Sequence, residues 1–148
     1  MRDDDVQGLT VALLAASRAL VEAISAGVEA RGFTGLRPAH GFAFTLLSRG
    51  GATVTQLAQH LDVTRQAAAQ LAAELAAKGY VEIQPHPDDA RARLIVLTGK
   101  GWACTRAADE AAAEVIQSWA KTVGTQRLRA LRDDLARIAR GGPLRPLW

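Results

Sequence analysis

The residues best suited to chemistry lie in one stretch, HPDDARARLIVLT, at positions 86–98. It places two adjacent carboxylates, Asp88 and Asp89, just before two arginines one residue apart, Arg91 and Arg93. Adjacent carboxylates can serve acid–base catalysis only beside a partner group and a pocket, and a proline-containing turn offers neither. The two arginines can bind an anionic partner or form a solvated hairpin end, and the charge pattern alone favours the solvated end.

Other reactive residue types are scattered along the chain. The three histidines, His40, His60 and His86, are too far apart in sequence to match the spacing of a metal site. The single cysteine, Cys104, cannot form an internal disulfide. We therefore expect no catalytic residues, no metal and no cofactor, and we interpret the chain as a protein that is not an enzyme.

The composition is that of one soluble domain, with 148 residues of which 49% are hydrophobic and 22% charged. The net charge of +3 and the pI of about 9.6 permit an anionic partner without requiring one. No stretch approaches the roughly 18 uninterrupted apolar residues of a membrane span, and the acidic start MRDDD has the wrong sign for a secretory signal. We expect a cytoplasmic protein with no membrane partner.

The first part of the chain predicts two helices. Helical spacing of apolar residues covers residues 4–31, and a second helix begins near Pro38 and ends at Gly50 and Gly51. The first helix carries two neighbouring apolar stripes, one of Val6, Leu9, Leu13, Leu20 and Ile24 and one of Val11, Leu14, Val21 and Val28. Because two stripes cover more of a helix than one small core can bury, this helix needs a second partner.

Two short helices around a tight turn come next. Residues 53–56, TVTQ, form a capping box that opens a helix ending at Leu61. Thr64 caps the following helix, which ends at Gly79 and directs three apolar residues inward, Ala68, Leu71 and Leu75.

A change from helical to twofold periodicity then predicts a β-hairpin. The residues YVEIQ read as a strand whose apolar residues, Ile83 included, are buried on one side, and residues 94–97 as a return strand that is apolar on both faces. The turn between them is at residues 86–90. Because side chains alternate along a strand, Arg91 and Arg93 are expected on one face of the return strand, near its exposed tip.

Two further helices complete the predicted elements. Thr98 caps the first, and Thr125 starts the second, which carries the apolar stripe Leu128, Leu131, Leu135 and Ile138. Trp102 and Trp119 lie on the apolar side of the first of these helices, where packing in the core is a commoner role than lining a ligand site. Residues 141–148, GGPLRPLW, are expected to form an irregular tail.

The segment TVTQLAQHLDVTRQAAAQLAAELAAKGYVEI, followed by DDARARLIVLTGKG, resembles the MarR family, the multiple-antibiotic-resistance-type transcriptional regulators. The most specific parts are residues 89–91 and 97–101. Asp62 stands where such turns often carry glycine, a tolerable departure because aspartate also adopts left-handed geometry. The resemblance implies a mainly α fold with a small antiparallel β-hairpin wing, that is, a winged helix-turn-helix with N- and C-terminal dimerisation helices.

The resemblance also implies how the chain is organised. Residues 1–148 form a single domain, with the winged helix-turn-helix DNA-binding region at residues 36–97. The dimerisation helices occupy residues 4–34 and 98–140, and residues 141–148 form the tail.

The implied site is a recognition helix, residues 64–78, in the major groove of DNA and a wing in the neighbouring minor groove. Glutamine can pair with adenine, and arginine suits the negative potential of a narrow minor groove, although Gln66 and Gln70 can also be plain helix surface. Asp89 is expected to orient an arginine through a charge-assisted bond. The expected DNA-binding residues are Thr64, Arg65, Gln66, Ala67, Ala69, Gln70, Arg91 and Arg93.

The implied function is a homodimeric, sequence-specific regulator of transcription, a repressor on a palindromic operator that a small ligand relieves. An aromatic or lipophilic ligand would suit a pocket lined partly by Phe42, Phe44, Trp102 or Trp119. The alternative is a winged-helix module that binds protein without specific DNA binding. The low basicity of the recognition helix, with only Arg65 and Lys78, favours this alternative.

Overall fold

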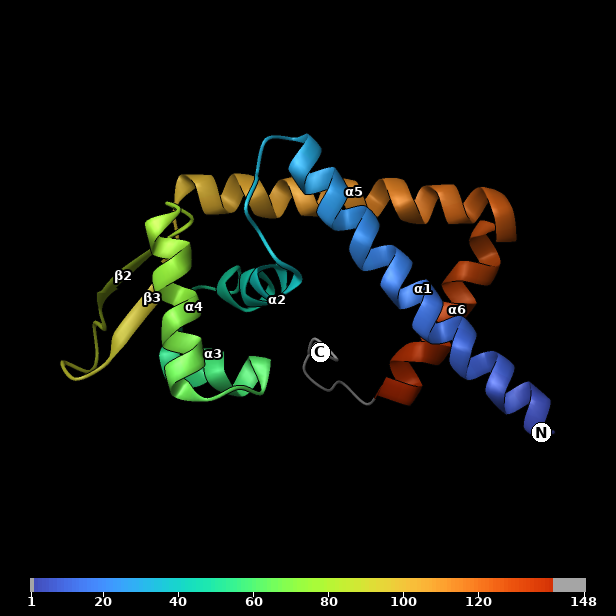
Figure 1. Cartoon of the computed structure of the whole chain (residues 1–148), viewed down its shortest axis with the longest axis horizontal. Helices are drawn as coiled ribbons and strands as arrows, with labels where there is room; N and C mark the ends of the chain where they lie inside the picture. Colours follow the sequence, from blue (N-terminus) through green and yellow to red (C-terminus); the bar gives the residue numbers. More distant parts are fainter. Residues whose placement is uncertain (1, 140–148) are drawn as a thin grey trace.

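The structure is a computed structural model that describes residues 2–139. It is mostly helical with a small antiparallel sheet (Figure 1), which confirms the expected fold class. The expected tail at residues 141–148 lies outside the described residues. The elements in chain order are α1 (Asp3–Ala30), α2 (Pro38–Leu47), β1 (Ala52–Thr53), α3 (Val54–Leu61), α4 (Arg65–Ala77), β2 (Val81–Pro85), β3 (Arg93–Leu97), α5 (Gly99–Val123) and α6 (Thr125–Ala139).

The helix starts expected from threonine caps are confirmed. At α3, the Gln56 backbone N–H donates to Thr53 Oγ1 at 3.2 Å, and the Thr53 backbone N–H donates to Gln56 Oε1 at 2.9 Å, which completes a capping box. Thr64 accepts from the backbone N–H of Ala67 at 3.1 Å and so caps α4. Thr98 caps α5 in the same way.

The turn between α3 and α4 depends on Asp62. This residue has φ 55° and ψ 47°, so it is left-handed as expected for an aspartate at a helix C-terminus. The next backbone N–H, that of Val63, donates back to the carbonyl of Ala58 at 3.0 Å. The turn therefore ends α3 at Leu61 and lets α4 start at Arg65.

The sheet has one more strand than the sequence predicts. Its order is β1-β3-β2, and both neighbours of β3 are antiparallel to it, with Ile95 opposite Ala52 on one side and Ile83 on the other. The strand β1 has only two residues, which is too short to show a period of two. The predicted hairpin is thus the larger part of a three-stranded sheet.

The expected burial of Ile83 is wrong. Its side chain is 42% exposed, and only Val81, at the base of β2, is buried on that strand. On the opposite strand Ile95 and Leu97 are buried. Ile83 is therefore exposed on the edge strand β2 although Ile95, opposite it on the central strand, is buried, and alternation alone does not tell which strand lies at the edge.

The core lies where α2, α3 and α4 pack over the sheet and the start of α5. Tyr80 is at its centre, with the ring of Phe44 at 5.8 Å and that of Phe33 at 6.4 Å between centroids. Its largest fully buried aliphatic residues are Leu47, Leu57, Leu75 and Ile95. Burial of each such side chain contributes about 1.5–3 kcal/mol, so this core holds the winged region together.

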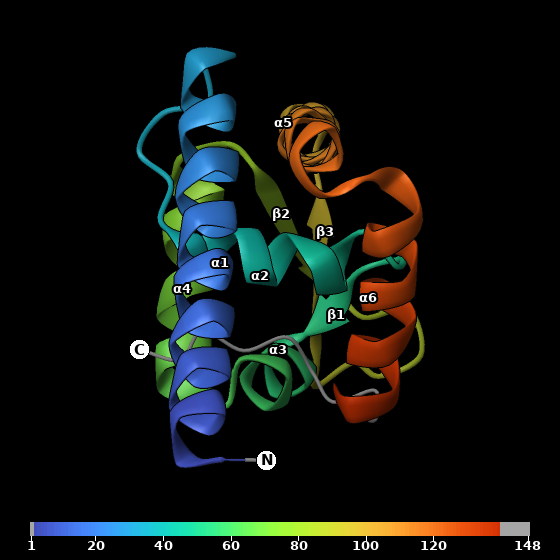
Figure 2. The same cartoon turned by 90° about the vertical axis from the view of Figure 1, so that its right-hand side faces the viewer.

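Helices α1, α5 and α6 form an arm beside the winged region (Figures 1 and 2). α1 meets α5 at Gly27 and Ala111, where a Cβ on the glycine would lie 2.5 Å from the alanine Cβ. Next to this crossing, the Arg31 guanidinium donates to Glu110 at 3.3 Å and to Glu114 at 2.6 Å. Close packing and two ion pairs therefore hold α1 against α5 within the arm.

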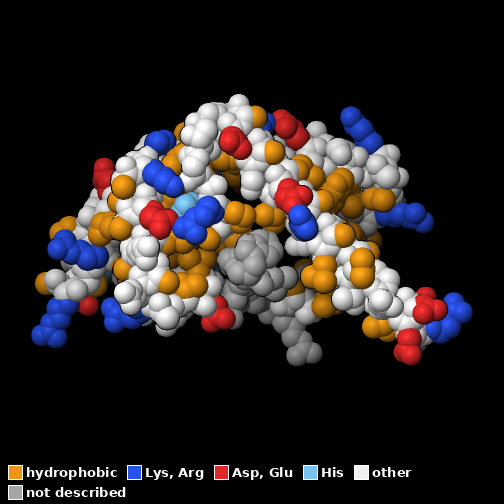
Figure 3. All heavy atoms as spheres, in the orientation of Figure 1, with side chains coloured by type: hydrophobic (Ala, Val, Ile, Leu, Met, Phe, Trp, Pro, Cys, Tyr) orange, Lys and Arg blue, Asp and Glu red, His pale blue; other side chains and the backbone are white. Residues whose placement is uncertain are grey.

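The arm leaves much of its apolar surface uncovered. Figure 3 shows hydrophobic side chains along α1 and around the end of α5. The exposed residues include Val6, Leu9, Val11, Leu13 and Leu14 on α1 and Leu131, Leu135 and Ile138 on α6. Both apolar stripes predicted for the first helix are therefore exposed over its N-terminal half.

By length and composition, α1 also qualifies as a membrane-crossing helix, with an 18-residue window of mean hydropathy 1.6. The sequence-based prediction of no membrane span rests on the absence of an uninterrupted apolar run. Polar residues such as Thr10 and Ser17 interrupt the run without lowering its average much. A helix covered by a protein partner has the same properties. The hydropathy of α1 therefore indicates that its apolar surface has a partner but does not distinguish protein from lipid.

Candidate nucleic-acid interface

The exposed side of α4 carries the residues predicted to read DNA. Arg65, Gln66, Ala67, Ala69 and Gln70 are all exposed, whereas Ala68, Leu71, Ala72 and Leu75 are buried. Thr64 is also exposed, but its hydroxyl accepts the capping bond from Ala67. The face of α4 that points away from the core thus combines one cation, two amides and small side chains, which permits close approach to base edges.

The hairpin tip is a short hydrogen-bonded loop. The His86 backbone N–H donates to the carbonyl of Ala92 at 3.1 Å, and the Ala92 N–H donates to the carbonyl of Asp89 at 3.1 Å. Within this loop, the Arg91 backbone N–H donates to Asp89 Oδ1 at 2.9 Å. This is the local turn that aspartate forms with the backbone two residues on.

The bond expected between Asp89 and an arginine goes to the backbone of Arg91 and not to a side chain. Among residues 2–139 no ion pair joins Asp89 to an arginine side chain, and its carboxylate accepts from the backbone of Arg91 instead. The backbone N–H is nearer along the chain and needs no ordering of a long side chain. Asp89 orders the loop, and it leaves the guanidinium of Arg91 available.

The two arginines of the tip differ in position. Arg93 is the first residue of β3, opposite Pro85, whereas Arg91 precedes the strand and lies in the loop. The prediction that both lie on one face of the strand is wrong in this respect, because the strand starts at Arg93, two residues after Arg91. Both side chains are exposed, and within residues 2–139 neither forms an ion pair. Figure 3 shows Lys and Arg side chains gathered at this end of the molecule.

A charged cluster beside α4 was not predicted. Arg37, just before α2, bonds Glu74 Oε2 of α4 at 2.7 Å, and His40 Nε2 lies 3.4 Å from the same oxygen. His40 is fully buried, and burial lowers its pKa while the hydrogen bond to Glu74 opposes that shift. Hydrogen bonds from Arg37 and His40 lower the pKa of Glu74. The sequence does hold a signal, since His40 shares the helical spacing of Ala43, Phe44 and Leu47, which face the core.

The hollow next to this cluster has a volume of about 300 Å³. It extends from the N-terminal end of α2 to the turn before α4, and Gln70 and Glu74 form its edge on α4. The lining residues are Arg37, Ala39, Leu61, Val63, Ala67, Gln70, Leu71 and Glu74.

The predicted aromatic pocket is not formed by the four residues named for it. Phe44 is buried in the core against Tyr80, while Trp102 is 41% exposed. Trp102 and Trp119 are 17 residues apart on α5, which separates them by about 25 Å along the helix. The two tryptophans therefore do not line one site within a single chain, and a ligand pocket lined partly by one of these residues stays a prediction.

Cys104 and the described carboxylates and histidines offer little reactive chemistry. Cys104 is buried, and burial raises its pKa to about 11, so the thiol stays protonated at neutral pH. Among residues 2–139 no three His, Cys, Asp or Glu side chains are grouped as metal ligands are.

The arrangement of α2, α3 and α4 with the three-stranded sheet defines the chain as a winged helix-turn-helix protein. Residues 33–92 match the model of the MarR family. The fold is also similar to that of a solved MarR family transcription regulator, with a TM-score of 0.76 at 22% identity.

Similar proteins include the uncharacterized proteins Rv2011c of Mycobacterium tuberculosis and Mb2034c of Mycobacterium bovis. Each is 35% identical over 94 residues, which is 64% of this chain and 66% of the relative. The chain thus matches these curated relatives over 66% of their length.

Solved structures resemble the chain over almost its whole length. RV1404 from Mycobacterium tuberculosis has a TM-score of 0.78 at 23% identity and covers 100% of this chain and 99% of its own. The transcriptional repressor CouR, bound to a 23-mer DNA duplex, has a TM-score of 0.74 at 25% identity, with 94% and 98% covered.

Proposed function

We propose that the protein is a homodimeric, sequence-specific DNA-binding regulator that represses transcription from a palindromic operator. The observation that carries this proposal is the exposed face of α4 beside a hairpin whose two arginines form no ion pair within residues 2–139. A free guanidinium gains more from a phosphate or a narrow groove than one already paired. The DNA duplex bound to the repressor CouR supports the same choice of partner.

In this proposal α4 reads the major groove and the hairpin tip enters the adjacent minor groove. Gln66 and Gln70 can each pair with adenine N6 and N7, and the methyl groups of Ala67 and Ala69 can contact thymine. Arg65, at the first turn of α4, is placed to bind a phosphate near the positive end of the helix. Arg91 and Arg93 supply the cations of the wing.

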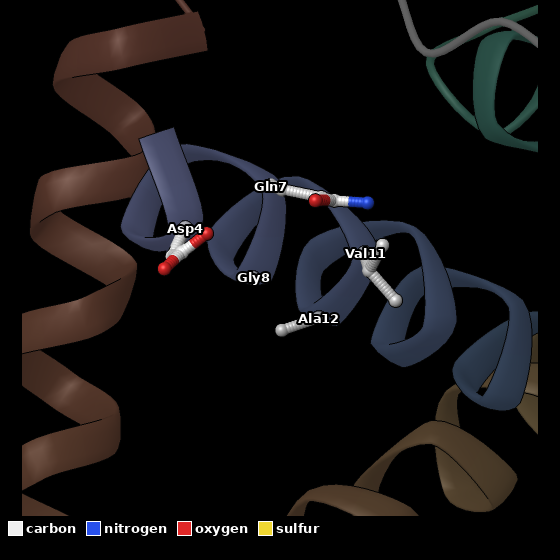
Figure 4. Close-up of a pocket in the computed structure, with 5 residues that line it drawn as sticks. All are labelled: Asp4, Gln7, Gly8, Val11 and Ala12. Carbon is white, nitrogen blue, oxygen red and sulfur yellow. The ribbon is translucent and has the colours of Figure 1, made fainter. Parts of the chain in front are cut away.

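A second copy of the chain is the partner proposed for the arm. The exposed apolar residues of α1 and α6 lie on helices of the same arm, and an open hollow of about 450 Å³ on α1 lies beside them. Figure 4 shows that its five lining residues come from α1 alone, so one chain does not enclose it: Asp4, Gln7, Gly8, Val11 and Ala12. Two copies related by a twofold axis would present recognition helices to half-sites about 34 Å apart.

Relief by a small aromatic or lipophilic ligand completes the proposed mechanism. Such a ligand would enter between the dimerisation helices and the winged region, and would change the separation of the two recognition helices. With DNA as its partner, the protein acts in the cytoplasm, and the apolar face of α1 is covered by protein and not by lipid.

A winged-helix module that binds protein remains the second candidate, because α4 and its ends offer few cations. Of its two cations, Arg65 and Lys78, Lys78 donates to the carbonyl of Gly35, and only Arg65 has no partner among residues 2–139. This observation lowers the expected number of phosphate contacts from α4.

A gel-shift titration against the DNA upstream of the protein's own gene separates the two candidates. The proposal predicts a discrete complex that survives excess unrelated duplex. Binding that is equally weak for every duplex would contradict specific DNA recognition and favour the protein-binding module.

A further inference from the structure

Glu74 is the polar link between α2 and the recognition helix. α4 packs on α3 and on β2 through apolar side chains. Figure 1 shows α2 beside α4, and here the contact includes two hydrogen bonds to one carboxylate oxygen. On the solvent side, the guanidinium of Arg37 lies 2.7 Å from Glu74 Oε2. On the core side, His40 Nε2 lies 3.4 Å from the same oxygen.

The hydrogen bonds fix the tautomer of His40. The Arg37 backbone N–H donates to His40 Nδ1 at 2.9 Å, so Nδ1 must be unprotonated. The proton of the neutral ring is then on Nε2, which donates to Glu74. Both ring nitrogens are satisfied, one by the first turn of α2 and one by α4. Loss of either partner would leave a polar atom unpaired in the core.

The link controls which face α4 exposes. Ala67, Gln70 and Glu74 follow one another at intervals of three and four residues and therefore lie along one stripe of the helix. All three also line the hollow beside Arg37. Rotation of α4 about its axis would move Gln70 and Ala67 away from the exposed face, and the anchored carboxylate of Glu74 resists that rotation.

We propose that His40, acting through Glu74, is a positioning residue that sets the orientation of the recognition helix for DNA. This inference rests on the proposed function of DNA binding. His40 does not touch DNA in this account. Its contribution is to hold Glu74, and through it the base-reading stripe, in one arrangement.

The sign of the effect of Glu74→Ala distinguishes positioning from simple charge. Removal of a carboxylate close to DNA should by itself strengthen binding to a polyanion. The positioning role predicts the opposite, a loss of about tenfold in affinity for the preferred site with little change for unrelated DNA. Glu82→Ala is the matched control. It removes the same charge from an exposed residue of β2 that is not part of the cluster of Arg37, His40 and Glu74. We expect it to bind as tightly as the unaltered protein or slightly more tightly.

Variants of His40 provide the second arm of the experiment. His40→Leu fills the space without hydrogen bonds, and we expect the same loss of specific affinity as for Glu74→Ala. His40→Gln retains one acceptor and one donor, and we expect it to restore most of that affinity. Because the two residues act as one unit, the double variant should lose no more than the worse single variant.

The measurement is the ratio of affinities for the preferred and an unrelated duplex, for full-length protein shown to be folded by circular dichroism. Since Glu74 lies at the surface, its variant keeps the experiment decisive even if His40→Leu unfolds. An unchanged ratio in Glu74→Ala, or tighter binding like that of Glu82→Ala, overturns the positioning role. Failure of the unaltered protein to bind any duplex specifically would instead overturn the proposed function, and the inference with it.

Discussion

Asp89 Oδ1 accepts the backbone N–H of Arg91 at 2.9 Å, so the carboxylate at the hairpin tip organises the loop and not the arginine side chain. A carboxylate near a DNA-binding arginine costs electrostatic attraction to phosphate. It is tolerated where the order that it gives to the loop outweighs that cost.

Substitution of Asp89 separates these two effects. Asp89→Asn and Asp89→Ala remove the same charge, but only asparagine keeps the oxygen that accepts the Arg91 N–H. We expect Asp89→Asn to bind DNA at least as tightly as the unaltered protein. Asp89→Ala should bind more weakly than Asp89→Asn by about 1 kcal/mol, the value of one local hydrogen bond. Equal affinities for the two variants would show that loop order is irrelevant to binding.

The two wing arginines should differ in importance. Arg91 lies in the loop and Arg93 at the start of β3, so we expect Arg91→Ala to weaken DNA binding more than Arg93→Ala. Loss of an arginine inserted in a groove costs about 1–3 kcal/mol. Arg106→Ala, on α5, is the matched control for the loss of one exposed cation. Unchanged affinity in Arg91→Ala would rule out a minor-groove role for this wing.

Gln70 should determine a preference for A·T pairs in each half-site. Bidentate pairing of glutamine with adenine discriminates by about 1–3 kcal/mol. Selection of preferred sites from random DNA should therefore yield A·T pairs at the contacted position, and the preference should relax in Gln70→Ala. Half-sites dominated by G·C there, or the same preference in the variant, would mean that Gln70 is only helix surface.

Acidification should destabilise the protein through His40. Burial lowers the pKa of His40 below its ordinary value of 6.5, while Glu74 raises it and Arg37 and Lys78 lower it further. The unfolded chain therefore binds a proton at His40 more readily than the folded chain, so this contribution to stability is complete above about pH 6.5 and is lost as the pH falls below it. The lowered pKa of Glu74 adds a further loss only below its ordinary value of 4.5.

Urea unfolding at a series of pH values measures this effect. The free energy of unfolding should fall more steeply between about pH 6.5 and pH 5 in the unaltered protein than in His40→Gln, which has no group to titrate. Parallel curves for the two proteins would contradict the assignment of a neutral, buried His40.

The sequence predicts the parts of this fold that local chemistry decides. Thr53, Thr64 and Thr98 cap helices because their hydroxyls accept from the backbone N–H three residues on, and such bonds need no distant partner. Asp62 is left-handed for an equally local reason. These features could be located to within a residue from the order of amino acids alone.

What escaped prediction depends on contacts between distant segments. The strand β1 exists because its two residues pair with β3, more than 40 positions away, and Ile83 is exposed on the edge strand β2 although Ile95 opposite it is buried. The link between His40 and Glu74 spans 34 residues and joins two helices, so neither helix reveals it alone. Likewise, a position on one face of α5 does not tell whether Trp102 and Trp119 lie at one site.

The central claim is that two copies of the chain place their α4 helices in successive major grooves of one DNA duplex. Footprinting of the full-length protein on its preferred duplex measures this most directly. The account predicts two protected half-sites of inverted sequence, with centres one helical turn, about 34 Å, apart. Protection of a single half-site by a protein that sediments as a monomer at micromolar concentration would contradict it.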